Sequence, residues 1–155
     1  MKFIVATKNK NKLTEIKEIL KNFPLEVVSM EDVGIDDEIE ENADSFEGNA
    51  MLKAKAIHEK TGGYVMADDS GLCIDALGGA PGIYSARFAG EDADYNTKIN
   101  KIWEMLDNSG SENRNARFVC AIALIDPEGK EHIVRGECEG VIHHEISGNN
   151  GFGYD

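Results

Sequence analysis

Short apolar stretches alternate with a helical pattern at the start of the chain. Lys2 to Ala6 and Leu25 to Ser29 are short, mostly apolar runs, and such runs predict buried strands. The segment between them carries apolar residues at helical spacing, which predicts a helix with one apolar stripe: Leu13, Ile16, Ile19 and Leu20. Phe23-Pro24 should end this helix, because the residue before a proline disfavours the helical backbone.

The next stretch predicts a loop followed by a second helix. Residues 31–44 are acidic and show no periodicity, so we expect a loop there. Asp44 and Glu47 form a capping-box-like start for the helix. The glycine pair Gly62-Gly63 supplies its end.

A third strand and a third helix follow. Tyr64 to Ala67 predicts a strand whose carboxyl end leads directly into Asp68-Asp69-Ser70-Gly71. Residues 78–90 form a glycine-rich loop that needs unusual backbone angles. The periodicity from Asp94 to Leu106 predicts a helix with its apolar face directed inward.

The last part of the chain predicts a β-hairpin. Arg117 to Ile125 and His132 to Ile142 are strand-like, and Asp126-Pro127-Glu128-Gly129 between them is typical of a turn. Alternating strands and helices followed by a hairpin indicate a mixed α/β fold. We expect a single domain over residues 1–155, without internal repeats.

Charge and cysteine content narrow the functional class. The net charge of −13 argues against non-specific binding to nucleic acid, which depends on basic contacts to phosphate. Cys73, Cys120 and Cys138 form no C-x-x-C pair, so neither a disulfide framework nor a zinc site is expected. The longest strongly apolar run, near Phe118 to Ile125, is too short to cross a bilayer. Nothing resembles a signal peptide, so we expect a cytoplasmic protein without a membrane partner.

The polar turn before the first helix is a candidate anion site. Free backbone N–H groups at a helix N-terminus favour a bound anion. The turn adds polar and cationic side chains to them: Thr7, Lys8, Asn9, Lys10, Asn11 and Lys12. It is neither a Walker loop nor a Rossmann fingerprint. Two interpretations stand, namely a polyphosphate site and an ordinary capped helix with surface lysines.

Asp68 and Asp69 are candidates for metal binding and acid–base chemistry. They follow a buried strand, at the end of the sheet where open α/β folds place their ligands. Burying both without a cation would be costly, and Mg²⁺ accepts one or two carboxylates together with phosphate oxygens and waters. One acid can bind the metal while the other takes a proton from water. Glu40 or Glu41 can complete the metal site; the alternative is a solvated turn capped by aspartates.

Motifs of other enzyme classes are missing from the sequence. The serines lack the G-x-S-x-G pattern of a serine hydrolase. The four histidines lack a metal-ligand spacing, and we interpret them as structural or exposed: His58, His132, His143 and His144.

Five motifs follow one another along the chain. They are T-x-N-x-x-K (Thr7 to Lys12), E-N-A-x-S-F-E-x-N-A-x-x-K-A (Glu41 to Ala54), A-D-D-S-G-L (Ala67 to Leu72), G-G-A-P-G-I-Y-S-A-R (Gly78 to Arg87) and G-F-G-Y-D (Gly151 to Asp155). In this order and spacing they resemble the inosine triphosphate pyrophosphatase family, whose members hydrolyse ITP, dITP and XTP. The resemblance covers essentially the whole chain.

The resemblance implies an activity and a fold. The activity is hydrolysis of non-standard purine nucleoside triphosphates to the monophosphate and pyrophosphate, which removes them from the nucleotide pool. The fold is two α/β lobes around a long, curved mixed sheet, with the active site in the cleft between the lobes. Members of the family are usually homodimers.

The resemblance also implies roles for particular residues. Thr7, Asn9 and Lys12 would hold the triphosphate. Asp69 would accept the proton and bind Mg²⁺ together with Glu40, with Asp68 close by. The remaining implied contacts are with substrate, by Ser70, and with the purine base, by Phe152, Gly153, Tyr154 and Asp155.

Two further interpretations remain. Members of the family continue past F-G-Y-D into a segment with a substrate-binding lysine and an S-H-R motif, so we expect a C-terminally incomplete domain. A catalytically silent nucleotide-binding protein is therefore one alternative, against which Glu40, Asp68 and Asp69 argue. The other is a Maf-type nucleotide pyrophosphatase, against which the A-D-D-S-G-L and G-G-A-P-G blocks argue.

Overall fold

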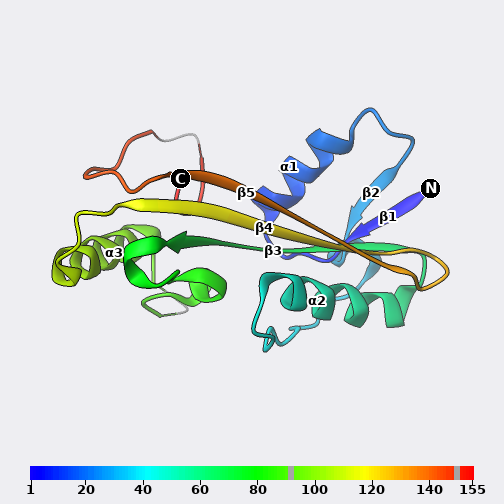
Figure 1. Ribbon diagram of the computed structural model, residues 1–155. Coiled ribbons are helices and arrows are strands. Elements are labelled where there is room, and N and C mark those ends of the chain that lie inside the picture. Colours follow the sequence, from blue (N-terminus) through cyan, green and yellow to red (C-terminus); the bar gives the residue numbers. More distant parts are fainter. Residues whose placement is uncertain (91–92, 149–150) are drawn as a thin grey trace. The chain divides into compact units, whose positions relative to one another are not determined.

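The computed structural model describes residues 1–90, 93–148 and 151–155, and it has the α/β alternation and the late hairpin expected from the sequence (Figure 1). The strands are β1 (Lys2–Val5), β2 (Glu26–Ser29), β3 (Tyr64–Ile74), β4 (Asn115–Ile125) and β5 (Glu131–Val141). The helices are α1 (Lys10–Leu20), α2 (Phe46–Thr61) and α3 (Tyr95–Ser109), with 3₁₀ helices at Glu31–Val33, Asp75–Leu77 and Gly82–Arg87. The sheet has the strand order β2-β1-β3-β4-β5, and β1 is parallel to both β2 and β3.

The chain forms two compact units, each built from two segments. The first unit comprises Met1–Asp69 and Ala121–Arg135. The second unit comprises Ser70–Cys120 and Gly136–Asp155. Among the described residues, no helix is long and apolar enough to span a membrane.

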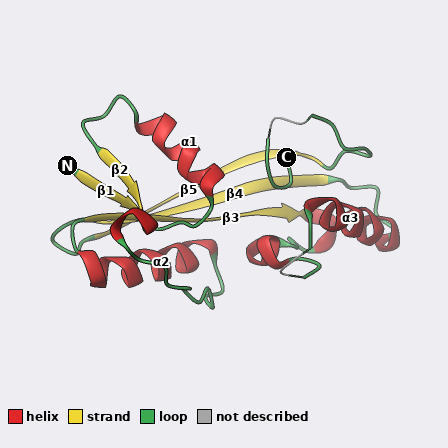
Figure 2. Ribbon diagram, turned by 180° about the vertical axis from the view of Figure 1, so that it is seen from behind, coloured by secondary structure: helices red, strands yellow, loops and turns green. Residues whose placement is uncertain are grey.

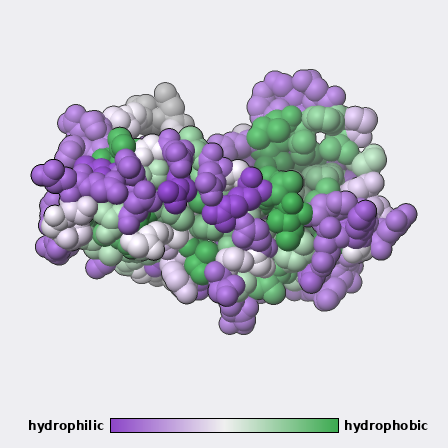
Figure 3. All heavy atoms as spheres, in the orientation of Figure 1, coloured by the Kyte–Doolittle hydropathy of each residue, from purple (hydrophilic) through white to green (hydrophobic). Residues whose placement is uncertain are grey.

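In the first unit the two helices cover opposite faces of the strands (Figures 1 and 2). The α1 face buries Phe3, Val5 and Met66, which pack with partly buried residues of α1 and β2. The α2 face buries the neighbours of these residues in the same strands, Ile4, Val65 and Ala67, together with three α2 residues: Ala50, Ala54 and Ile57. This alternation follows from the two-residue period of a strand. Figure 3 shows a broad apolar surface around α1 and β2.

The second unit packs α3 against the ends of β3 and β4. Ile102 and Leu106 of α3 form a buried cluster with Leu72, Ile74 and Ala116. The helix begins after Asp94, whose carboxylate accepts a hydrogen bond from the backbone N–H of Thr97 at 2.7 Å. Such a cap satisfies one of the free N–H groups at a helix start.

Three local predictions were wrong. Ser45, not Asp44, caps α2, because the Ser45 hydroxyl accepts from the Gly48 N–H at 3.0 Å. The predicted loop at 31–44 contains the 3₁₀ helix Glu31–Val33. The third strand does not end at Ala67, since β3 continues through the Asp68-Asp69-Ser70-Gly71 segment to Ile74.

The hairpin and the glycine-rich loop were predicted correctly. The backbone N–H of Asp126 donates to the Lys130 carbonyl at 3.1 Å and closes the β4–β5 turn. Gly78, Gly79 and Gly82 all adopt positive φ angles, as the loop prediction required.

Candidate active site

Two adjacent carboxylates lie buried in the middle of β3. Asp68 is 5% exposed and Asp69 is 6% exposed. Because side chains alternate along a strand, Asp68 lies on the face of Met66, which packs with α1. Asp69 lies on the face of Ala67, which packs with α2. Asp68 therefore lies on the α1 face of the strand, and Asp69 lies on the α2 face.

Lys12 neutralises the charge of Asp68. The Lys12 ammonium lies 2.8 Å from Oδ2 of Asp68, and their side chains are 25% and 7% exposed. Lys12 stands in the first turn of α1, where the Asn9 side chain caps the helix by accepting from the N–H groups of Asn11 and Lys12. The cap fixes the start of the helix and so brings Lys12 to the acid.

Asp69 is surrounded by groups from α2 and from the loop before it. Asn49 of α2, which is 1% exposed, donates from Nδ2 to Oδ2 of Asp69 at 3.3 Å. Burial raises the pKa of Asp69 to about 6; the nearby ammonium of Lys53 opposes this rise and the carboxylate of Glu41 adds to it. Lys53 and Glu41 also pair with each other at 3.3 Å. Asp69 is thus a carboxyl group that exchanges its proton near neutral pH.

Asn49 also fixes the loop that carries Glu41. Its Oδ1 atom accepts from the Ala43 N–H at 2.9 Å, while its Nδ2 atom reaches Asp69. One buried amide therefore ties the loop before α2 to the acid of β3. Lys53 follows Asn49 by four residues, so both side chains lie on the same face of α2.

The predicted anion turn is organised by its own polar side chains. Besides the cap made by Asn9, the Thr7 hydroxyl accepts from the Asn9 N–H at 3.1 Å. Lys8 lies 3.3 Å from Glu38 and 3.7 Å from Asp36 of the acidic loop. The side chains from position 8 to position 11 are exposed: Lys8, Asn9, Lys10 and Asn11. The structure therefore contains the capped helix and an exposed basic turn at its start.

Glu40 and Glu41, the two glutamates considered for the metal, differ in their relation to Asp69. Glu40 is exposed, whereas Glu41 is half-buried and raises the pKa of Asp69. Within residues 1–90, 93–148 and 151–155, no three His, Cys, Asp or Glu side chains gather closely enough to hold a metal ion. A cation at this place would need further oxygen ligands from water or substrate.

The F-G-Y-D segment lies in the second unit and has a defined turn. The Asp155 carboxylate accepts from the Phe152 N–H at 3.1 Å. A Cβ at Gly151 would lie 2.8 Å from Cβ of Asp155, so a larger residue there would displace the Asp155 side chain. Tyr154 is half-buried, and its hydroxyl donates to the Ser85 carbonyl at 2.6 Å. Burial raises the pKa of Tyr154 to about 12.

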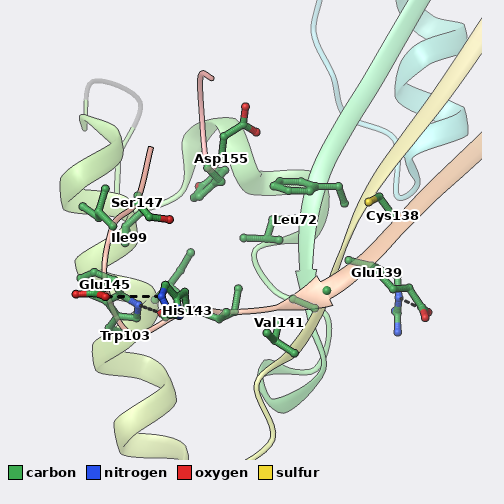
Figure 4. A pocket seen from close by; sticks show the side chains of 18 residues that line it. Leu72, Ile99, Trp103, Cys138, Glu139, Val141, His143, Glu145, Ser147 and Asp155 are labelled. Carbon is green, nitrogen blue, oxygen red and sulfur yellow. Dashed lines mark hydrogen bonds and ion pairs between the residues drawn. The ribbon is translucent and has the colours of Figure 1, made fainter. Parts of the chain in front are cut away.

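A cavity of about 310 Å³ lies in the second unit beside this segment (Figure 4). Leu72 and Ile99 point toward it from β3 and α3. Tyr154 and Asp155, two of the residues predicted around the base, also line it. The structure thus places part of the predicted base site at an apolar cavity. Ser70, predicted to contact substrate, is half-buried at the start of the second unit.

The sequence matches the Ham1 family over residues 3–155. The chain belongs to the Ham1 family. The match includes Lys12, Asp68, Asp69 and the F-G-Y-D segment, and it confirms the resemblance drawn from the five motifs.

Two bacterial relatives match nearly the whole chain. A Ham1 relative from Bacillus anthracis named dITP/XTP pyrophosphatase is 49% identical over 154 residues, which are 98% of this chain and 76% of the relative. One from Thermoanaerobacter sp. (strain X514), with the same name, is 46% identical over 155 residues, which are 100% of this chain and 78% of the relative.

Solved Ham1-type structures have the same fold. The structure of a HAM1 protein from Coxiella burnetii matches with a TM-score of 0.92 and 37% identity, covering 100% of this chain and 79% of that one. The nucleoside-triphosphatase, or dITP/XTP pyrophosphatase, from Mycobacterium abscessus matches with a TM-score of 0.84 and 42% identity, covering 100% and 81%. These matches confirm the predicted α/β fold with a mixed sheet.

Two residues of this Ham1 site, Asn49 and Lys53, were not predicted from the sequence. Both lie within the motif Glu41 to Ala54. Their sequence spacing offered a clue, because an asparagine and a lysine four residues apart share one face of a helix. What the sequence lacked was the direction of that face, which depends on how α2 packs on β3.

Proposed function

We propose that this chain hydrolyses dITP, XTP and ITP to the corresponding monophosphate and pyrophosphate. The observation that carries the proposal is the buried pair Asp68 and Asp69, with Lys12 at 2.8 Å from Asp68 and Asn49 at 3.3 Å from Asp69. Relatives up to 49% identical that bear the name dITP/XTP pyrophosphatase support the choice of substrate.

Asp69 has the properties of a general base. In the metal-free protein its pKa of about 6 leaves it largely ionised at neutral pH, so that it can accept a proton from water. The water attacks the α-phosphorus as its proton passes to Asp69. The bond between the α-phosphorus and the oxygen that bridges it to the β-phosphorus breaks. Pyrophosphate leaves, and the nucleoside monophosphate remains.

The basic turn at the start of α1 suits the leaving pyrophosphate. Lys8 and Lys10 carry exposed ammonium groups beside Lys12, which pairs with Asp68, and the α1 N-terminus favours an anion. Thr7 and Asn9 add a hydroxyl and an amide. In this proposal the turn holds the β- and γ-phosphates and stabilises the charge that develops on them.

The carboxylates of Asp69 and Glu41 fit a divalent cation. Both are hard oxygen donors, and the cost of burying Asp69 in its charged form, seen as its raised pKa, is what a cation would relieve. We therefore propose Asp69 with Glu41, in place of Glu40, as the residues that hold Mg²⁺. When bound, Mg²⁺ would neutralise phosphate oxygens of the substrate.

An assay of products tests the proposal. The protein is incubated with dITP, XTP, ITP and ATP, with Mg²⁺ or with EDTA, and the products are separated by ion exchange. We expect monophosphate and pyrophosphate from the first three nucleotides, and no turnover in EDTA. Stepwise release of orthophosphate would contradict the proposed cleavage site. Binding of dITP without cleavage would identify a catalytically silent protein.

We also propose a cytoplasmic homodimer, on the resemblance to the family alone. Sedimentation equilibrium of the protein separates a dimer from a monomer, and fractionation of the source cells tests the location. A monomer at micromolar concentration would refute the proposed assembly.

A further inference from the structure

Lys98 is a buried lysine outside the acid site. It lies in the first turn of α3, and it is only 3% exposed. Its ammonium donates to the Ala86 carbonyl at 2.6 Å and lies 4.6 Å from the centre of the Tyr95 ring. Burial lowers the pKa of Lys98. A lysine is rarely buried without a compensating role, so these contacts call for an explanation.

The ring of Tyr95 connects Lys98 to the F-G-Y-D segment. Tyr95 and Tyr154 meet edge to face with their ring centres 5.1 Å apart. A Cβ at Gly153 would lie 3.8 Å from the Tyr95 ring, so that ring also borders the backbone of the segment. Such aromatic pairs have a preferred geometry, which makes them suited to fixing orientation.

The 3₁₀ helix Gly82–Arg87 is the common anchor of these contacts. Tyr154 donates to the carbonyl of Ser85, and Lys98 donates to the carbonyl of the next residue, Ala86. The buried Ser85 hydroxyl accepts from the Leu72 N–H at 2.9 Å and donates to the Gly82 carbonyl at 2.6 Å. Leu72 stands three residues after Asp69 in β3. A continuous set of contacts within the second unit thus runs from Lys98 through Tyr154 and Ser85 to β3.

We infer that Lys98 is a positioning residue for the Phe152–Asp155 segment of the second unit, the segment predicted to contact the purine base. It holds the 3₁₀ helix and Tyr95 in place, and through them it fixes the Phe152–Asp155 segment. The inference rests on the proposed function, because it takes this segment as the part that receives the purine. A defect at Lys98 should therefore weaken contacts to the nucleoside and spare contacts to the pyrophosphate end.

Inhibition by the two products distinguishes contacts to the nucleoside from contacts to pyrophosphate. We expect Lys98→Met to raise the KM for dITP and the inhibition constant of dIMP by about tenfold, with kcat and the inhibition constant of pyrophosphate changed less than about twofold. Tyr95→Leu should reproduce this pattern because it removes the ring. Tyr95→Phe should behave as wild type because it keeps the ring.

Two control variants separate positioning from simple loss of stability. Lys101→Met removes an exposed lysine from the same helix and should change neither constant. Ile57→Ala opens a core cluster of the first unit that does not include Tyr154, and it should lower the melting temperature without raising the dIMP constant selectively. If Lys98→Met cannot be produced as folded protein, the Tyr95→Leu and Tyr95→Phe pair decides the question.

The outcomes distinguish this inference from the proposed function. A wild-type protein that does not hydrolyse dITP refutes the proposed function, and the inference fails with it. A wild-type protein that is active, with Lys98→Met or Tyr95→Leu showing an unchanged dIMP constant, refutes the inference alone. Equal weakening of dIMP and pyrophosphate would also refute it, because that result indicates a general loss of structure.

Discussion

Asp68 and Asp69 are neighbours in sequence, yet their carboxylates lie on opposite faces of β3. Lys12 of α1 contacts the first acid and Asn49 of α2 contacts the second. The contacts of the two acids therefore come from different helices, although the Lys12 ammonium also lowers the pKa of Asp69 against the effect of burial. Variants of Lys12 and of Asn49 test the contact to each acid.

Asp69→Asn should abolish most of the activity without disturbing the fold. The amide keeps the shape of the side chain but cannot accept the proton, so we expect turnover of dITP to fall at least ~100-fold. Steady-state kinetics with a circular dichroism spectrum as a check on folding measure this. If Asp69→Asn keeps turnover within about threefold of wild type, Asp69 is not part of the mechanism.

The pKa of Asp69 also predicts a pH dependence of stability in the metal-free protein. Its folded pKa of about 6 exceeds the ordinary value of 3.8, so the folded state binds the extra proton between these two values. This contribution is fully present below pH 3.8 and is lost as the pH rises through about 6. At neutral pH the charged group then destabilises the fold by about 3 kcal/mol. Urea unfolding in EDTA should show Asp69→Asn more stable than wild type at pH 7, with a smaller gap at pH 4.

Lys12→Gln should destabilise the protein because it leaves the buried Asp68 charge without its ammonium partner. Loss of one member of a buried ion pair costs about 3 kcal/mol or more. Adding Asp68→Asn should recover most of that stability but none of the activity. Lys10→Gln, at an exposed position of the same turn, is the control and should cost less than about 0.5 kcal/mol. If Lys12→Gln and Lys10→Gln destabilise the protein equally, the ion pair between Lys12 and Asp68 contributes nothing to the free energy of unfolding.

Glu41→Gln and Glu40→Gln should differ in their need for metal. Glu41 interacts with Asp69 and Lys53, whereas Glu40 is exposed. We expect Glu41→Gln to raise the Mg²⁺ concentration for half-maximal turnover by about tenfold or more, and Glu40→Gln to leave it unchanged. The reverse ranking would restore Glu40 as the metal residue.

The cap at the start of α2 can be tested by its effect on stability. Ser45→Ala removes the side chain that caps the helix and should cost about 1 kcal/mol. Asp44→Ala changes the exposed residue just before it and should have little effect. Thermal unfolding of the two variants compares them directly, and a larger loss for Asp44→Ala would contradict the observed cap.

The sequence predicted the elements better than it predicted their ends. The predicted apolar stripe identified α1, and Leu13, Ile16 and Leu20 pack against the strands as expected, but Ile19 was wrongly included, because it is 72% exposed. The strand at Tyr64 was expected to stop at Ala67, because charged residues are rarely buried in mid-strand. Asp68 and Asp69 stay in the strand because Lys12 and Asn49 reach them from two helices. Such long-range partners leave no local pattern in the sequence.

The acid site shows the same limit. The acidic loop alone left Glu40 and Glu41 undecided, since adjacent acids without periodicity look alike, and the resemblance to the family implied Glu40. Our proposal of Glu41 rests on contacts absent from any local pattern: the Asn49 amide ties Ala43 to Asp69, and the Glu41 carboxylate raises the pKa of that acid.

The division of the chain into two units has a consequence for protein engineering. Each unit is assembled from two segments that are distant in sequence. The first unit includes residues 121–135, which follow the first segment of the second unit along the chain. Cutting the chain after Asp69 would therefore give a fragment that lacks part of its own core, including Ala123 and Ile125. A first unit made as a single polypeptide needs a new connection from Asp69 to Ala121. Only a rewired chain of this kind, rather than a simple truncation, would show whether the half that carries the acids folds by itself.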